Sequence, residues 1–111
     1  MGEIYEDRRQ EPRFTTAGKY RLDTAQSDSI EGPILDLSLN GAMLERNSTI
    51  ELQAGTHHRV SLEFTGQTPF HGDALLVYIG DARIGIEFYD MDPQNFAALS
   101  ALIESLTRAN R

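Results

Sequence analysis

Three arginines stand close together near the start of the chain, at Arg8, Arg9 and Arg13. A guanidinium group is a planar fork that donates paired hydrogen bonds to a phosphate or a carboxylate, so three of them can converge on one anion. Pro12 stiffens the approach to Arg13. The residues alone leave a second interpretation open, in which this segment is a solvated tail whose arginine–glutamate pairs contribute little stability.

A carboxylate and a hydroxyl, those of Asp36 and Ser38, stand two residues apart. On a strand their side chains would share one face, and Leu35, Leu37 and Leu39 would point to the other. A carboxylate suits the N1–H and exocyclic amine of guanine, and a hydroxyl beside it can donate or accept. In the alternative interpretation the two side chains only satisfy backbone donors near a turn.

Short runs rich in β-branched and aromatic residues, several with alternating polarity, predict antiparallel strands. The predicted strands are Phe14–Leu22, Gly32–Leu37, Ala42–Arg46, Arg59–Thr65, Phe70–Ile79 and Ala82–Phe88. Asn40-Gly41 predicts a hairpin because both residues tolerate positive φ, and Gly80-Asp81 predicts a second two-residue turn. Residues 23–29 are expected to form a loop, and residues 47–56 an irregular connection.

The last part of the chain changes to helical periodicity. Asp92 is the predicted N-cap and Pro93 the first helical residue of a helix over about residues 93–108. Its apolar stripe consists of Phe96, Leu99, Leu102, Ile103 and Leu106. The expected fold class is therefore all-β with a C-terminal helix, a six-stranded antiparallel β-barrel over residues 14–111 that follows a flexible arginine-containing loop at residues 1–13.

Composition narrows the possible functions. The chain has 111 residues, enough for one domain, and a net charge of −7. Residues 1–21 carry five basic and four acidic side chains, a net charge of +1, which leaves −8 for residues 22–111. An acidic body with a basic start favours a local anion site over a nucleic-acid surface. The absence of cysteine and of long apolar runs predicts a cytoplasmic protein with no membrane insertion.

Residues that could support catalysis or metal binding do not form a recognisable set. His57, His58 and His71 lack the spacing of a metal motif, and adjacent histidines on a strand point apart. Ser38 lacks the strand–turn–helix context of a hydrolase nucleophile. We therefore expect a binding protein rather than an enzyme, with no catalytic residue, metal or cofactor. The aromatics are expected to be core or barrel-surface residues rather than stacking platforms; they are Phe64, Phe70, Tyr78 and Phe88.

The order and spacing of the two polar motifs make them more specific together than either motif is alone. The first is an RRxxxR segment and the second a DxSxxG segment in the predicted hairpin; their defining residues are Arg8, Arg9, Arg13, Asp36, Ser38 and Gly41. Together with the glycine-containing late strand at Ile84–Phe88, they make residues 7–107 resemble the PilZ domain, the bacterial receptor module for cyclic di-GMP.

This resemblance implies a ligand site between the N-terminal loop and the outer surface of the barrel. The arginines would hold phosphates and guanine edges, Asp36 and Ser38 would read a guanine, and Gly41 would leave room for the turn or the ligand. In the family, an arginine at the position of Arg8 is associated with a second, intercalated ligand. We therefore hypothesise two cyclic di-GMP molecules per chain.

The resemblance also implies a way of signalling. Ligand would order the N-terminal loop, and the protein, as a monomer or weak dimer, would act on an unidentified effector protein in the control of motility, biofilm, exopolysaccharide or virulence. The C-terminal helix offers a second contact for such a partner. The alternative is a protein-interaction adaptor of the same fold that needs no ligand. A third possibility, binding of single-stranded nucleic acid, is disfavoured by the acidic body.

Overall fold

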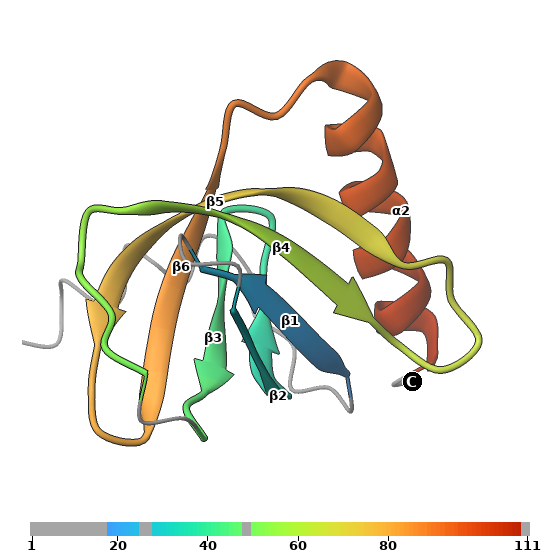
Figure 1. The fold of residues 1–111 in the computed structure, drawn as a ribbon. Helices are drawn as coiled ribbons and strands as arrows, with labels where there is room; N and C mark the ends of the chain where they lie inside the picture. Colours follow the sequence, from blue (N-terminus) through green and yellow to red (C-terminus); the bar gives the residue numbers. More distant parts are fainter. Residues whose placement is uncertain (1–17, 25–27, 48–49, 110–111) are drawn as a thin grey trace, which may run out of the picture.

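A computed structural model of the chain describes residues 18–24, 28–47 and 50–109. The described elements are, in chain order, β1 (Lys19–Asp23), β2 (Ser29–Leu37), β3 (Gly41–Glu45), β4 (His57–Glu63), β5 (Phe70–Ile79), β6 (Arg83–Tyr89) and α2 (Pro93–Ala109). Figure 1 shows the strands arranged around a common interior and the helix lying beside them. The predicted fold class, an all-β barrel with a C-terminal helix, is confirmed.

The strands form a closed antiparallel barrel in the order β1-β2-β3-β6-β5-β4, and β4 pairs with β1 to complete it. The register shifts twice, between Ile34 and Asp36 in β2 and between Leu76 and Tyr78 in β5. Each shift is a β-bulge, which inserts an extra residue, bends the strand and increases its twist. Both bulges lie in the long strands that must curve to close the barrel.

The interior of the barrel and the inner face of α2 form one hydrophobic core. Alternate residues of the strands supply it, as expected for strands with one buried and one exposed face. Its buried members are Tyr20, Leu22, Ile30, Ile34, Leu37, Ala42, Leu44, Val60, Leu62, Phe64, Phe70, Ala74, Leu76, Ile84, Ile86, Leu99, Leu102 and Leu106. The other face of each strand points away from this core and forms the outer wall of the barrel.

Helix α2 begins as predicted and packs against β5. The Asp92 carboxylate accepts a hydrogen bond from the Asn95 amide at 2.8 Å, which makes Asp92 the N-cap. Leu99, Leu102 and Leu106 are buried. Phe96 was also expected on the buried stripe, but 49% of its surface is exposed. Figure 1 shows why, since the first turn of α2 stands clear of the strands.

Several local expectations need correction. Strand β2 begins at Ser29, which pairs with Asp23, so the predicted loop before Gly32 is shorter than expected. The residues expected to form the first part of the first strand, 14–17, lie outside the described residues. Neither Asn40 nor Gly41 has a positive φ, so the β2–β3 turn does not depend on left-handed backbone. In the described part of the chain, no helix is long and apolar enough to cross a membrane.

Candidate ligand-binding site

Asp36 faces outward from β2, next to a bulge. It pairs with Met43 of β3, while the following residue, Leu37, is buried opposite Ala42. The strict alternation expected from the sequence fails at Leu35, which is the extra residue of the bulge. Ile34 points inward in place of Leu35, and Leu37 is buried as expected. The bulge therefore sets which residue of the segment faces out, and places the Asp36 carboxylate on the outer wall of the barrel.

Ser38 does not share this face. It lies after the end of β2 and only 1% of its surface is exposed. Its hydroxyl donates to the Gly41 carbonyl at 3.4 Å and accepts from the Asn40 amide at 3.3 Å, while the Ser38 amide donates to the same carbonyl at 2.9 Å. In this conformation Ser38 thus satisfies backbone groups of the turn. The expected common face for Asp36 and Ser38 is wrong, because the strand ends between them.

Gly41 is required by packing between strands. A Cβ at this position would overlap the carbonyl oxygen of Ile86 and would lie 3.1 Å from the Cα of Glu87, both backbone atoms of β6. The same strand holds the turn through a 2.8 Å hydrogen bond from the Phe88 amide to the Asn40 carbonyl. The glycine therefore lets β6 approach the DxSxxG turn closely, which fixes the position of Asp36 relative to β6.

The outer wall beside Asp36 continues across three more strands. Asp36 pairs with Met43, Met43 with Gly85 of β6, and Gly85 with Tyr78 of β5. We call these four residues the Asp36–Tyr78 row. The neighbours of Met43 and Gly85 along their strands are buried in the core, so the row lies on the outer wall, where Gly85 itself is buried among the side chains around it. Sequence reasoning missed this row because the two bulges that set its register are produced by pairing between strands.

The described chain starts at Gly18, close to this row. Arg8, Arg9 and Arg13 themselves lie outside the described residues. The Gly18 carbonyl accepts a hydrogen bond from the Ile34 amide at 2.8 Å, two residues before Asp36. Arg13 precedes Gly18 by five residues, a span of at most about 18 Å. The covalent chain thus keeps Arg13 within reach of the outer wall at Asp36.

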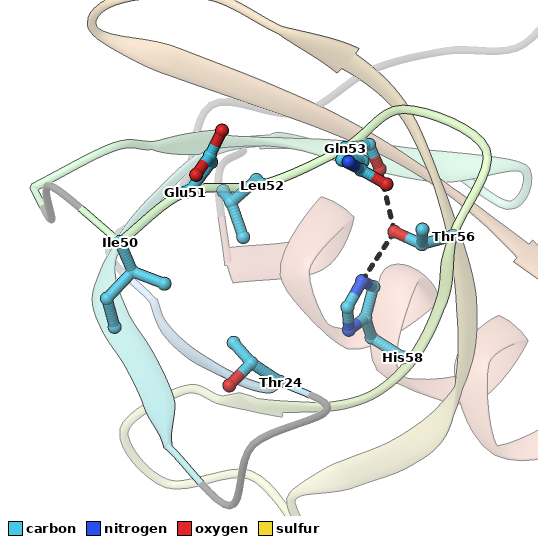
Figure 2. Close-up of a pocket in the computed structure, with 7 residues that line it drawn as sticks. All are labelled: Thr24, Ile50, Glu51, Leu52, Gln53, Thr56 and His58. Carbon is cyan, nitrogen blue, oxygen red and sulfur yellow. Dashed lines mark hydrogen bonds between the residues drawn. The ribbon is translucent and has the colours of Figure 1, made fainter.

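A pocket of about 410 Å³ lies at the other end of β1 (Figure 2). It is lined by Thr24, Ile50, Glu51, Leu52, Gln53, Thr56 and His58. The His58 ring is held on both sides: Nδ1 donates to the Asp23 carbonyl at 2.9 Å, and Nε2 lies 2.8 Å from the Thr56 hydroxyl. This pocket contains none of the residues predicted to bind ligand, and the length of β1 separates it from Gly18.

The remaining histidines make pairwise contacts, His57 of β4 with a residue of β6 and His71 of β5 with a residue of β4. His57 stacks on Tyr89 with ring centroids 4.3 Å apart, and His71 Nδ1 lies 2.9 Å from the Ser61 hydroxyl. Among the described residues, no three histidine, cysteine or acidic side chains gather closely enough to hold a metal ion. These contacts are consistent with structural roles for the histidines.

One buried tyrosine of β1, Tyr20, has a shifted pKa. The Tyr20 hydroxyl donates to the Glu45 carbonyl at 2.7 Å. Burial, with a smaller contribution from the negative charge of Glu45, raises the pKa of Tyr20 to about 12, and the positive charge of Arg46 opposes this rise. Tyr20 is therefore a neutral hydrogen-bond donor that ties β1 to the end of β3, not an acid–base group.

Comparison with known proteins decides the family. The PilZ domain matches residues 7–105, nearly the whole chain and both polar motifs. The chain belongs to the PilZ domain family. The family resemblance inferred from Arg8, Arg9, Arg13 and the DxSxxG segment is thereby confirmed. A search of curated proteins gave no match.

Solved structures place this PilZ domain among known relatives. It is similar to the PilZ domain of YcgR from Escherichia coli, solved with c-di-GMP, at 25% identity and a TM-score of 0.81, over 94% of this chain and 95% of that one. Against the longer YcgR chain, solved in complex with c-di-GMP, the similarity covers only 48% of that protein. The Bacillus subtilis inhibitor of motility MotI/DgrA shares the fold, with a TM-score of 0.70, 16% identity and coverage of 91% of this chain and 52% of that one.

Proposed function

We propose that this PilZ domain is a bacterial cytoplasmic receptor for cyclic di-GMP, a binding protein without catalytic activity of its own. The observation that carries the proposal is the hydrogen bond between Gly18 and Ile34, which holds the start of the described chain two residues from Asp36. Arg13 precedes Gly18 by only five residues, so on ligand binding the arginines would meet the Asp36 carboxylate on the outer wall. The c-di-GMP found with the PilZ domain of YcgR supports the same ligand for this chain.

The chemistry of the site suits this ligand. Cyclic di-GMP has two guanines and two phosphates in one ring. The outward carboxylate of Asp36 matches the donor edge of a guanine, and arginine is the favoured bidentate partner of phosphate and of guanine O6 and N7. The body of the chain is acidic, so the arginines also neutralise a ligand that the rest of the surface repels.

Gly41 and Ser38 support the site in different ways. Gly41 sets the distance between the turn and β6, as its close approach to Ile86 requires. The two hydrogen bonds of the Ser38 hydroxyl, at 3.3 and 3.4 Å, are long for their type. We expect Ser38 to hold the turn in the free protein, and its direct contact with a guanine stays a prediction.

The proposed signal is ordering of the N-terminal segment over the wall. Ligand would bring Arg9 and Arg13 against the barrel and create a surface for an effector protein, in the control of motility or biofilm formation. The exposed Phe96 at the start of α2 is a candidate second contact for that effector. Arg8 bears on stoichiometry, because its guanidinium can stack on a base of a second ligand molecule.

Isothermal titration of the full chain tests the proposal. Cyclic di-GMP is expected to bind, and GTP and cyclic GMP are not. Arg9→Ala and Arg13→Ala are each expected to weaken binding about 10- to 150-fold, the value of one charge-assisted hydrogen bond of about 1.5 to 3 kcal/mol. Arg59→Ala is the matched control, because Arg59 is an exposed arginine that bonds Asp73 at 3.2 Å on the β4–β5 wall.

The outcomes are distinct. If wild type takes up no cyclic di-GMP, the chain is a ligand-independent adaptor of the same fold and the proposed function is wrong. If Arg9→Ala, Arg13→Ala and Arg59→Ala all bind as wild type does, the arginine assignment is wrong. Two ligands per wild-type chain and one per Arg8→Ala chain would support the role of Arg8, whereas one ligand per wild-type chain would contradict it.

A further inference from the structure

His58 lies on the inward-facing side of β4, at one end of the barrel. The next two residues on that side of the strand are buried in the core. Figure 2 shows the His58 ring pointing into the pocket at this end, towards Thr56. Its Nδ1 lies 2.9 Å from the Asp23 carbonyl oxygen and its Nε2 lies 2.8 Å from the Thr56 hydroxyl oxygen, which in turn donates to the Gln53 carbonyl at 2.7 Å. We call these four residues the His58 network.

The three hydrogen bonds of the His58 network together require a proton on both ring nitrogens. A backbone carbonyl oxygen only accepts, so Nδ1 must donate to Asp23. The Thr56 hydroxyl has one proton, and the Gln53 carbonyl takes it. The hydroxyl oxygen can therefore only accept from Nε2, which must also donate. A ring that donates from both nitrogens is the positively charged imidazolium.

A neutral His58 ring satisfies only two of the three bonds. If the proton is on Nδ1, the Thr56 hydroxyl must turn to donate to Nε2, and the Gln53 carbonyl loses its donor. If the proton is on Nε2, the lone pair of Nδ1 faces the lone pairs of the Asp23 carbonyl. One bond around the pocket is thus made only while His58 is charged.

The segment that carries Thr56 has a second attachment, which contains no titrating group. The Gly55 amide donates to the Leu76 carbonyl of β5 at 2.7 Å, and the Leu76 amide donates to the Thr56 carbonyl at 2.9 Å. Backbone groups keep their protons at every pH near neutrality, so this attachment is constant. The His58 network adds an attachment to the end of β1 that depends on the proton of the ring.

The charges around His58 are compatible with a positive ring. Among the described residues that line the pocket, the charged one besides His58 is the acidic Glu51. The two arginines on the neighbouring positions are paired with carboxylates, at 3.3 and 3.2 Å, and His57 points to the opposite face of β4. The titratable or charged groups on the elements around the ring, besides Glu51, are Arg21 and Asp23 of β1, Asp28 before β2, His57 and Arg59 of β4, and Asp73 of β5.

We infer that the His58 network is a proton-dependent switch at this end of the barrel. It joins β4, the end of β1 and the segment before β4 when the ring has two protons, and it releases one of its bonds when the ring has one. Histidine ordinarily changes charge between about pH 5 and pH 8, so the closure of the pocket depends on pH in that range. Because the complete network requires the second proton, its third bond contributes stability at the acidic end and is lost as the pH rises.

His71 provides the contrast within the same protein. Its Nδ1 lies 2.9 Å from the Ser61 hydroxyl, and no further hydrogen bond of that hydroxyl fixes the direction of its proton. A neutral ring can make this bond, because the hydroxyl can either donate or accept. His71 therefore needs no second proton, although it lies on the neighbouring strand.

Urea unfolding of the full chain without ligand tests the inference. From about pH 5.5 to about pH 8, the folding equilibrium constant of wild type is expected to fall about 2- to 13-fold further than that of His58→Gln, the value of one hydrogen bond. Thr56→Val removes the hydroxyl and is expected to lose the same pH dependence, whereas Thr56→Ser and the matched control His71→Gln keep it. The inference is wrong if either His58→Gln or Thr56→Val keeps the wild-type pH dependence.

A measurement on the wild-type protein covers the case in which these variants fail to fold. The ¹⁵N NMR signals of the imidazole rings report which ring nitrogens carry a proton. His58 is expected to keep both protons up to a higher pH than His71 does. Loss of the second proton from His58 at the same pH as from His71, or at a lower pH, would overturn the inference. Neither experiment contains cyclic di-GMP, so both outcomes are independent of the proposed function.

Discussion

Replacing Gly41 by alanine distinguishes a packing role from a ligand-clearance role for this glycine. The added Cβ would overlap the Ile86 carbonyl oxygen and lie 3.0 Å from the carbonyl carbon and 3.1 Å from the Glu87 Cα. These are backbone atoms, which cannot rotate aside, so β3 and β6 must separate. Overpacking costs about 1 to 3 kcal/mol in general, and for a backbone clash we expect about 3 kcal/mol. In a domain of this size that lowers the melting temperature by about 13 °C.

Gly85→Ala is the matched control for this experiment. Gly85 also lies on the outer wall, one strand away, but its added Cβ would meet only side-chain atoms, at 3.2, 3.7 and 3.8 Å. We expect a cost below about 1 kcal/mol, partly offset by the lower chain entropy of alanine in the unfolded state. Thermal and urea unfolding without ligand measure both variants. If Gly41→Ala melts with wild type but no longer binds cyclic di-GMP, the packing explanation is refuted and the glycine serves the ligand.

Three further predictions concern stability. Leu44 is fully buried, so Leu44→Ala should lower the free energy of unfolding, measured with urea, by about 2 to 5 kcal/mol. Leu39 is 38% exposed, so Leu39→Ala should lower it by less than about 1 kcal/mol. Equal losses in the two variants would contradict the assignment of the core. The pKa of Tyr20 is raised from 10.0 to about 12 in the folded state. The contribution of the neutral tyrosine to the free energy of unfolding is therefore complete below pH 10 and is lost as the pH rises towards 12. The urea midpoints at about pH 9 and about pH 11 should differ less in Tyr20→Phe than in wild type. Asp92→Ala should cost about 1 kcal/mol through loss of the N-cap bond, and an unchanged urea midpoint would show that Asp92 does not stabilise α2.

Features that depend on local sequence were predictable. Alternation in Arg59–Thr65 and the N-cap at Asp92 each rest on a few neighbouring residues and a known preference. The turn between β5 and β6 was predicted one residue early, because its loop residues are Asp81 and Ala82. The closed six-stranded barrel followed from the number of short strands and the lack of intervening helices, and the structure confirms it. The family followed from the spacing of two polar motifs, which is also a property of the chain alone.

Features that depend on pairing between strands were not predictable. The bulges at Leu35 and Val77 arise from register with β3 and β6, and they decide which residues face outward. Without them Leu35 was expected inside, and Asp36 and Ser38 on one face. Gly41 does not have a positive φ, so backbone conformation does not explain the need for glycine at this position. The need comes from contact with β6, more than 40 residues away in the sequence. Tyr78 was expected to be ordinary barrel surface, because no local pattern places it in register with Asp36.

Chemical-shift mapping of the wild-type protein with cyclic di-GMP tests the central claim most directly. The amides of Asp36, Met43, Gly85 and Tyr78 are expected to shift together at stoichiometric ligand, because they lie on one outer row. Amides that line the pocket at the other end of β1, such as that of Thr56, are expected to stay in place. Shifts confined to the pocket, with the row unchanged, would contradict the account of where this PilZ domain binds its ligand.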